Sequence, residues 1–251
     1  MIRRVYLWIE LFLVFFAVPG LFALIVDPLD RADGAFAALG LGAINAMERP
    51  TALLMPALIL FCLATLAWLL LDRSFDNRRL WGWAATKREA PRMGLTACGL
   101  MVFLTLFATL LNPWTDVLTV TAPDGSSGTA LFRLPREAPV LVPLILVFYP
   151  IFSCYLQEIA YRAFFFHRYA RILPWRWGMI GVNAVAFMWL HIVFWHWMAL
   201  ALTLPAGVLF AWTYDRTRST LAVTLEHGLL GWWAFVVGLG WFVFTGSIGA
   251  S

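Results

Sequence analysis

The stretch Tyr155-Leu-Gln157-Glu158-Ile-Ala-Tyr-Arg162-Ala-Phe-Phe-Phe-His-Arg168 decides how the rest of the chain is interpreted. It begins inside a long apolar run and ends in a basic cluster, so a helix through it places Gln157, Glu158 and Arg162 at membrane depth. Ionisable residues are rare there and are functional candidates by default. On an α-helix, Glu158 and Arg162 lie one turn apart and can pair, whereas Gln157 points about 100° away. Such a polar turn either performs chemistry or holds helices together.

The composition is that of a membrane protein. Of the 251 residues, 62% are hydrophobic and only 13% are charged, whereas a soluble domain carries about 25% charged residues. The longer apolar runs can cross a bilayer as helices, and a β-barrel would show short alternating segments instead. The sequence therefore predicts an all-α fold, a polytopic transmembrane helical bundle of about seven spans. The expected spans are residues 5–26, 51–71, 93–111, 140–166, 177–194, 198–212 and 221–244.

The whole chain is expected to form a single integral membrane domain. Residues 1–139 would be an N-terminal region of three spans and loops, and residues 140–244 a core that carries the polar motifs. Residues 72–92 are interpreted as a basic connection, and 35–46 as a re-entrant or interfacial helix. Residues 119–132 contain a Pro-Asp-Gly turn signal, which fits a small hairpin or a plain loop equally well.

Charge in the connections predicts the orientation in the membrane. Basic and acidic loops alternate along the chain, and the positive-inside rule then places the N-terminus in the cytoplasm. The net charge of +4 resides in these loops, so it does not indicate a nucleic-acid partner. The expected partner is the lipid bilayer, and the expected location is a bacterial-type inner membrane.

Three polar residues on separate spans fall at similar depth. Counted from the basic end of each span, Glu158, His191 and His227 lie roughly 15, 21 and 12 Å along their helices. They can therefore share one site, where a carboxylate beside a histidine activates water and a second histidine stabilises an oxyanion. Glutamate and histidines can also hold zinc, but the sequence has no HExxH motif. We expect no cofactor and favour zinc less.

Three motifs, in order, resemble those of the CAAX-type membrane endopeptidase family, also called glutamic intramembrane proteases. They are Gln157-Glu158-Ile-Ala-Tyr-Arg162 for Glu-Glu-xxx-Arg, Phe187-Met-Trp-Leu-His191 for Phe-xxx-His, and His227-Gly-Leu-Leu-Gly231 for His-xxx-Asn/Asp. The resemblance covers about residues 140–244. It implies an all-helical membrane bundle with its site inside the membrane, which hydrolyses a peptide bond of a membrane-associated protein or peptide.

The resemblance also implies roles for individual positions. The family's water-activating glutamate and histidine correspond to Gln157 and His191, and its supporting glutamate and arginine to Glu158 and Arg162. Its oxyanion-binding pair corresponds to His227 and Gly231.

Two of these positions depart from the family pattern. Gln157 has no basic carboxylate and cannot act as a general base, and Gly231 has no amide to donate. The chain can belong to a Gln-Glu subgroup, or it can be an inactive relative that acts as a membrane scaffold or binder. In an active protein, Glu158 or Glu226 would serve as the base, with Asn183 as a candidate supporting residue. A small-solute transporter is a further alternative, but the chain shows no inverted repeat.

Overall fold

The computed structural model describes residues 2–27, 50–112, 118–121 and 127–243. Among these residues, seven helices are long and apolar enough to cross a membrane, which confirms the polytopic all-α fold. They are Ile2–Ile25, Thr51–Leu71, Asn77–Leu110, Leu141–Arg168, Arg176–Phe194, Trp197–Thr217 and Thr220–Val237. The expected helix over 35–46 lies outside the described residues.

Several of these spans are built from consecutive helical segments. The α-helices are α1 (Ile2–Phe12), α2 (Val18–Ile25), α5 (Leu54–Leu71), α6 (Trp83–Leu111), α7 (Arg133–Glu137), α8 (Leu141–Tyr149), α9 (Tyr155–Glu158), α10 (Phe165–Arg168), α11 (Arg176–Leu190), α12 (Trp197–Thr217) and α13 (Thr220–Val237). Short 3₁₀ turns cover Pro50–Leu53, Asn77–Leu80, His191–Phe194 and Leu239–Val243.

The third span is longer than predicted. The basic connection expected over residues 72–92 is largely helical, because α6 begins at Trp83 and continues through Pro91. Hydropathy misses this part because it carries charge, and the charged side chains of Glu89 and Arg92 are held by partners on other helices. The seventh span is shorter than predicted, since α13 ends at Val237 before Gly238 (φ +99°). A left-handed glycine of this kind is a common helix terminator.

A two-stranded hairpin forms between the third and fourth spans. Strand β1 (Thr119–Thr121) pairs antiparallel with β2 (Ser127–Thr129), and Thr119 is opposite Thr129. Of the two interpretations of this stretch, the hairpin is therefore correct. The turn itself lies outside the described residues.

The chain divides into two compact units that interleave along the sequence. The first unit comprises Met1–Phe75 and Ala160–Trp212, and the second comprises Asp76–Ile159 and Thr213–Ser251. The division of the chain into regions 1–139 and 140–244 stays a prediction.

Aromatic packing and indole hydrogen bonds stabilise the first unit. The ring of Phe15 is fully buried and meets Tyr161 and Phe165 edge-on, at centroid distances of 5.1 and 5.0 Å. The indoles of Trp189 and Trp195 donate to backbone carbonyls of the first span, each at 2.8 Å. Indole N–H groups need such acceptors when they leave water, so these bonds fix the first span against α11 and the turn after it.

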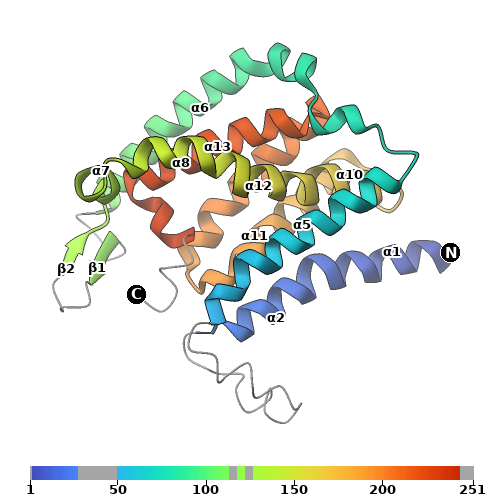
Figure 1. The fold of residues 1–251 in the computed structure, drawn as a ribbon, viewed down its shortest axis with the longest axis horizontal. Helices are drawn as coiled ribbons and strands as arrows, with labels where there is room; N and C mark the ends of the chain where they lie inside the picture. Colours follow the sequence, from blue (N-terminus) through green and yellow to red (C-terminus); the bar gives the residue numbers. More distant parts are fainter. Residues whose placement is uncertain (1, 28–49, 113–117, 122–126, 244–251) are drawn as a thin grey trace, which may run out of the picture. The chain divides into compact units, whose positions relative to one another are not determined.

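The second unit is organised around α13, which packs against α6 and α8 (Figure 1). Ser219 caps α13: its hydroxyl accepts the amide N–H of Ala222 at 3.2 Å. The same hydroxyl is 2.9 Å from Oγ1 of Thr86 at the start of α6. The cap therefore joins the beginnings of the third and seventh spans within one polar contact.

The fourth span is not a regular α-helix. Two π-helical turns, Pro150–Cys154 and Ile159–Phe164, lie on either side of the short α9 that carries Gln157 and Glu158. A π turn hydrogen-bonds from i to i+5 and is often found at functional sites. The polar motif is thus placed where the ordinary helical repeat of 3.6 residues does not apply.

Candidate active site

A buried carboxylate and a buried histidine pair in the second unit. Oε1 of Glu158, in α9, lies 2.8 Å from Nδ1 of His227, in α13. The side chain of Glu158 is fully buried and that of His227 is 7% exposed. Burying a carboxylate is costly unless it is paired and hydrogen-bonded, and His227 provides that partner. This contact joins the first and third sequence motifs.

Tyr149 is the hydrogen-bond partner of the other ring nitrogen of His227. Its hydroxyl oxygen, at the end of α8, lies 3.2 Å from Nε2. An ionised carboxylate can only accept hydrogen bonds, so with an ionised Glu158 the ring proton of a neutral His227 is on Nδ1. Nε2 is then the acceptor, and the hydroxyl of Tyr149 donates to it. Such a ring has its basic nitrogen turned away from the carboxylate, as in the histidine of a catalytic triad.

Two glycines bring α13 close to the end of α8. A Cβ atom at Gly228 would lie 2.6 Å from Cγ of Pro150, and a Cβ atom at Gly231 would lie 2.6 Å from Cε1 of Tyr149. Neither position has room for a larger residue while its neighbour keeps its place. The missing side chain at Gly231, a departure from the family motif, therefore leaves the space in which the ring of Tyr149 lies.

Gln157 points to a neighbour on its own span. Its amide Nε2 donates to the hydroxyl of Ser153, one turn earlier, at 2.9 Å. A carboxamide cannot take a proton from water, and here it helps to satisfy the polar atoms of the π turn. Gln157 is buried beside Glu158 but has different chemistry.

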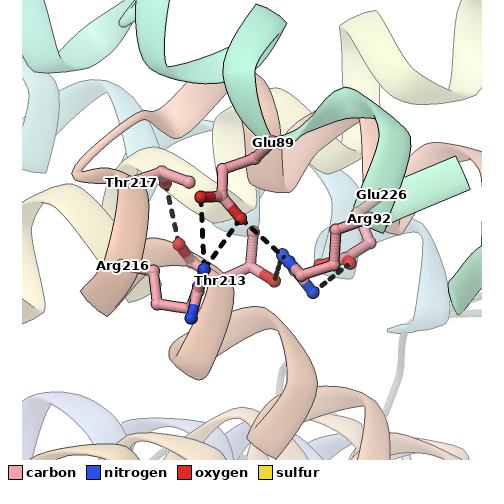
Figure 2. Close-up of polar contacts among 6 residues, drawn as sticks. All are labelled: Glu89, Arg92, Thr213, Arg216, Thr217 and Glu226. Atoms are coloured by element: carbon pink, nitrogen blue, oxygen red, sulfur yellow. Dashed lines mark hydrogen bonds and ion pairs between the residues drawn. The ribbon is translucent and has the colours of Figure 1, made fainter.

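Glu226 belongs to a separate polar cluster (Figure 2). Its Oε1 lies 3.9 Å from Nη1 of Arg92. Arg92 also bonds Glu89 at 2.9 Å and the hydroxyl of Thr213 at 3.0 Å, and Arg216 contacts Glu89 from α12 at 3.3 Å. Consecutive residues of a helix point about 100° apart, so Glu226 meets Arg92 while His227 meets Glu158. This arrangement favours Glu158 over Glu226 as the carboxylate that acts with His227.

The remaining motif residues lie in the first unit. Arg162 is fully buried, with its guanidinium carbon 4.8 Å from the ring centre of Phe187 and 5.9 Å from that of Phe210. Nδ1 of His191 is 2.8 Å from the backbone carbonyl oxygen of Phe187. The phenylalanine of the Phe-xxx-His motif thus contacts both the arginine of the first motif and its own histidine, by a cation–π contact and a hydrogen bond.

Asn183 makes the interhelical hydrogen bond that its buried position suggests, since its amide donates to the backbone carbonyl of Tyr161.

Glu158 and His227 belong to the second unit, whereas Arg162 and His191 belong to the first unit. The Glu158–Arg162 ion pair and the convergence of all motif residues on one site therefore stay predictions.

The sequence interpretation missed Tyr149 and Ser153. Both lie in the apolar run that leads into the first motif, and both contact a motif side chain. The available signal was polarity: between Val140 and Cys154 they are the residues with a hydroxyl group. In a span where polar groups need partners, such residues merit the same scrutiny as the charged ones.

A metal site would need several ligating side chains close together. In the part of the chain that the structure describes, no group of three or more His, Cys, Asp or Glu side chains is placed to hold a metal ion. Catalysis without a metal stays a prediction.

Comparison with known proteins supports the assignment made from the motifs. The family model described as "Type II CAAX prenyl endopeptidase Rce1-like" matches residues 139–233, which include all three motifs and Tyr149. Comparisons with curated proteins and with solved structures gave no match. Over residues 139–233 the chain is therefore similar to the CAAX-type intramembrane endopeptidase family, as the three motifs suggested.

Proposed function

We propose that this integral membrane protein hydrolyses a peptide bond of a membrane-associated protein or peptide, with the Glu158–His227 pair activating the attacking water. The observation that carries the proposal is the buried 2.8 Å contact between Oε1 of Glu158 and Nδ1 of His227, within the segment that the endopeptidase family model matches. It provides a carboxylate–histidine couple in a chain whose usual base position holds Gln157.

The chemistry follows from the two nitrogens of the imidazole. Glu158 accepts a hydrogen bond from Nδ1–H and orients the ring, which leaves Nε2 as the base. A water that inserts between Nε2 and the hydroxyl of Tyr149 gives its proton to that nitrogen while its oxygen bonds to the peptide carbonyl carbon. Glu158 stabilises the imidazolium, which then returns the proton to the leaving amine as the C–N bond breaks.

The substrate is proposed by class. The family match supports a substrate held in or at the bilayer, and nothing in the proposed chemistry requires a prenyl group on the peptide. Charge alternation supports a cytoplasmic N-terminus in a bacterial-type inner membrane. The proposed reaction uses no metal, so chelation with EDTA should leave the rate unchanged.

Activity in proteoliposomes tests the proposal. The probes are an internally quenched farnesylated CAAX peptide and the same peptide without the prenyl group. Glu158→Gln and His227→Gln should each reduce kcat at least a hundredfold, as expected for loss of general acid–base catalysis. Glu137→Gln is the matched control, because that carboxylate is exposed and pairs with Arg133 at the surface. Wild-type rates in Glu158→Gln would overturn the proposal.

One observation favours a second function, an inactive membrane scaffold or binder. The amide of Gln157 is bonded to Ser153 at the position where the family has its water-activating glutamate. In such a protein the polar pair would hold the bundle together, and hydrolysis would require a glutamate at position 157.

A further inference from the structure

The third motif lacks its polar side chain at Gly231, yet the same place in the molecule is polar. We propose that Tyr149, whose hydroxyl lies where that side chain would extend, acts as a positioning residue for His227 from a different helix. The proposal rests on the proposed function of the Glu158–His227 pair, because it concerns how that pair is held.

Tyr149 and a side chain at position 231 would compete for the same space. A Cβ atom at position 231 would lie 2.7 Å from the hydroxyl oxygen of Tyr149 and 2.6 Å from its Cε1. The phenol therefore occupies the space into which a side chain at 231 would extend. A tyrosine on α8 and any larger residue at 231 exclude each other, so the glycine and the tyrosine form one coupled arrangement.

The hydroxyl of Tyr149 also has hydrogen-bonding chemistry comparable to that of an asparagine amide. A phenolic hydroxyl is both a donor and an acceptor, as is the amide of an asparagine. Tyr149 applies this group to Nε2 of His227 at 3.2 Å, while Glu158 holds Nδ1 at 2.8 Å. The imidazole is thus held at both nitrogens by residues from the fourth span, one on either side of the π turn Pro150–Cys154.

Neighbouring residues restrict the movement of the Tyr149 side chain. The ring of Tyr149 is itself fixed, since it meets the rings of His227 and Phe235 edge-on at centroid distances of 5.9 and 5.6 Å. Pro150 follows Tyr149 directly and packs beside Gly228. A tyrosine held in this way orients the ring of His227 with little freedom, which is the task of a residue that supports a catalytic group.

The alternative is that Tyr149 only fills space. The variant Tyr149→Phe distinguishes a positioning role from a space-filling role, because it keeps the ring and removes the hydroxyl. A positioning role predicts a fall in kcat of about tenfold, the effect of one lost hydrogen bond, with KM unchanged. It also predicts that the ¹⁵N resonance of His227 Nε2 moves toward that of an imidazole nitrogen without a hydrogen bond. A space-filling role predicts neither change.

Tyr155→Phe is the matched control. Tyr155 lies on the same span, and its hydroxyl donates to the backbone carbonyl of Leu80 at 3.2 Å, away from His227. This variant should leave kcat and the His227 resonances as in the wild type. Wild-type kcat and wild-type Nε2 resonance in Tyr149→Phe would overturn the proposal.

A second pair of variants tests the exclusion directly. Gly231→Asn should lower kcat because it displaces Tyr149, and Tyr149→Ala should lower kcat because it removes the hydroxyl. The double variant should recover at least a third of the wild-type kcat, since the asparagine then has the space and the polarity. A double variant no faster than the slower single variant would count against the coupled arrangement.

The NMR measurement keeps this proposal separate from the proposed function. Should the wild type and Glu158→Gln both fail to cleave either peptide, the proposed endopeptidase activity fails. The ¹⁵N resonance of His227 in Tyr149→Phe still decides whether Tyr149 positions the ring.

Discussion

A Cβ atom placed on Gly228 would lie 2.6 Å from Cγ and 2.8 Å from Cβ of Pro150. The proline ring cannot turn aside as a long side chain can. The contact therefore limits how closely the fourth and seventh spans approach each other within the second unit. That spacing also determines whether the hydroxyl of Tyr149 lies within hydrogen-bond distance of His227.

Gly228→Ala should destabilise the protein. Overpacking of this kind costs about 1–3 kcal/mol of unfolding free energy, and we expect a loss in that range in an SDS titration of the protein in mixed micelles. Gly99→Ala is the control, because a Cβ atom there meets nothing within 4 Å and alanine favours the helix. Equal stability of both variants would show that the contact with Pro150 is easily relieved.

Arg92→Met should be among the more damaging changes in the second unit. It removes the cation that faces the fully buried side chain of Glu226 and the carboxylate of Glu89. Breaking a buried pair from one side costs about 3–5 kcal/mol, measured by the same titration. Adding Glu226→Gln to Arg92→Met should recover part of the loss, because the buried charge is then gone.

Arg88→Met provides the comparison for this prediction. Arg88 lies on α6 near Arg92 but is exposed, and exposed charges contribute about 0–1 kcal/mol. If both single variants lose the same stability, the cluster of Figure 2 has no special role.

Acid should weaken one contact in the first unit. Asp72 accepts hydrogen bonds from the backbone N–H of Ser74 at 2.9 Å and from its hydroxyl at 2.7 Å, and His167 lies 3.1 Å away. The Ser74 N–H first, then its hydroxyl and His167, lower the pKa of Asp72 from 3.8 to about 2. A lowered pKa in the folded state means that the contact stabilises the protein above pH 3.8 and that this contribution is lost as the pH falls toward 2.

The measurement compares the wild type with Asp72→Asn across this range. The wild type should be more stable from pH 7 to pH 5, and the difference should shrink between pH 4 and pH 2. Ser74→Ala should narrow the difference because it removes one of the donors. A difference that stays constant down to pH 2 would contradict the assignment to Asp72.

Gln157→Glu distinguishes the protease from the inactive scaffold. If Glu158 and His227 already activate water, the wild type cleaves the quenched peptides and the added carboxylate changes kcat by less than about tenfold. The scaffold alternative predicts cleavage by Gln157→Glu alone. Gln157→Ala, which removes the bond to Ser153 without adding a carboxylate, controls for local rearrangement.

The sequence predicted how deep the polar residues lie in the membrane, but it did not predict toward which partners their side chains point. Hydropathy located all seven spans, and helix rise placed Glu158 and His227 at similar depth, where the structure pairs them. Hydropathy did not predict the first part of α6, because this part of the helix is charged. Its charged side chains have partners on α12 and α13. A scale that scores residues singly does not register such partners.

Side-chain pairing depended on features that a helical repeat does not contain. The π turn Ile159–Phe164 begins directly after Glu158, so the α-helical repeat assumed from the sequence does not describe this segment. Tyr149 reaches His227 because two glycines allow close packing, and that consequence depends on which helix faces them. Motif spacing thus predicted the candidate residues, whereas their partners required the three-dimensional structure.

The π turn at Pro150–Cys154 also determines how the fourth span responds to a change in length. Such a turn accommodates one residue more than the α-helical repeat. Deleting a single residue there, for example Ile151, would let the segment become regular α-helix while Glu158 and Tyr149 keep their relative direction. An inserted residue would instead turn Glu158 by about 100° relative to Tyr149. The carboxylate would then leave the side of the helix that faces His227, although every motif residue would still be present. In this span a one-residue insertion should therefore be more harmful than a one-residue deletion.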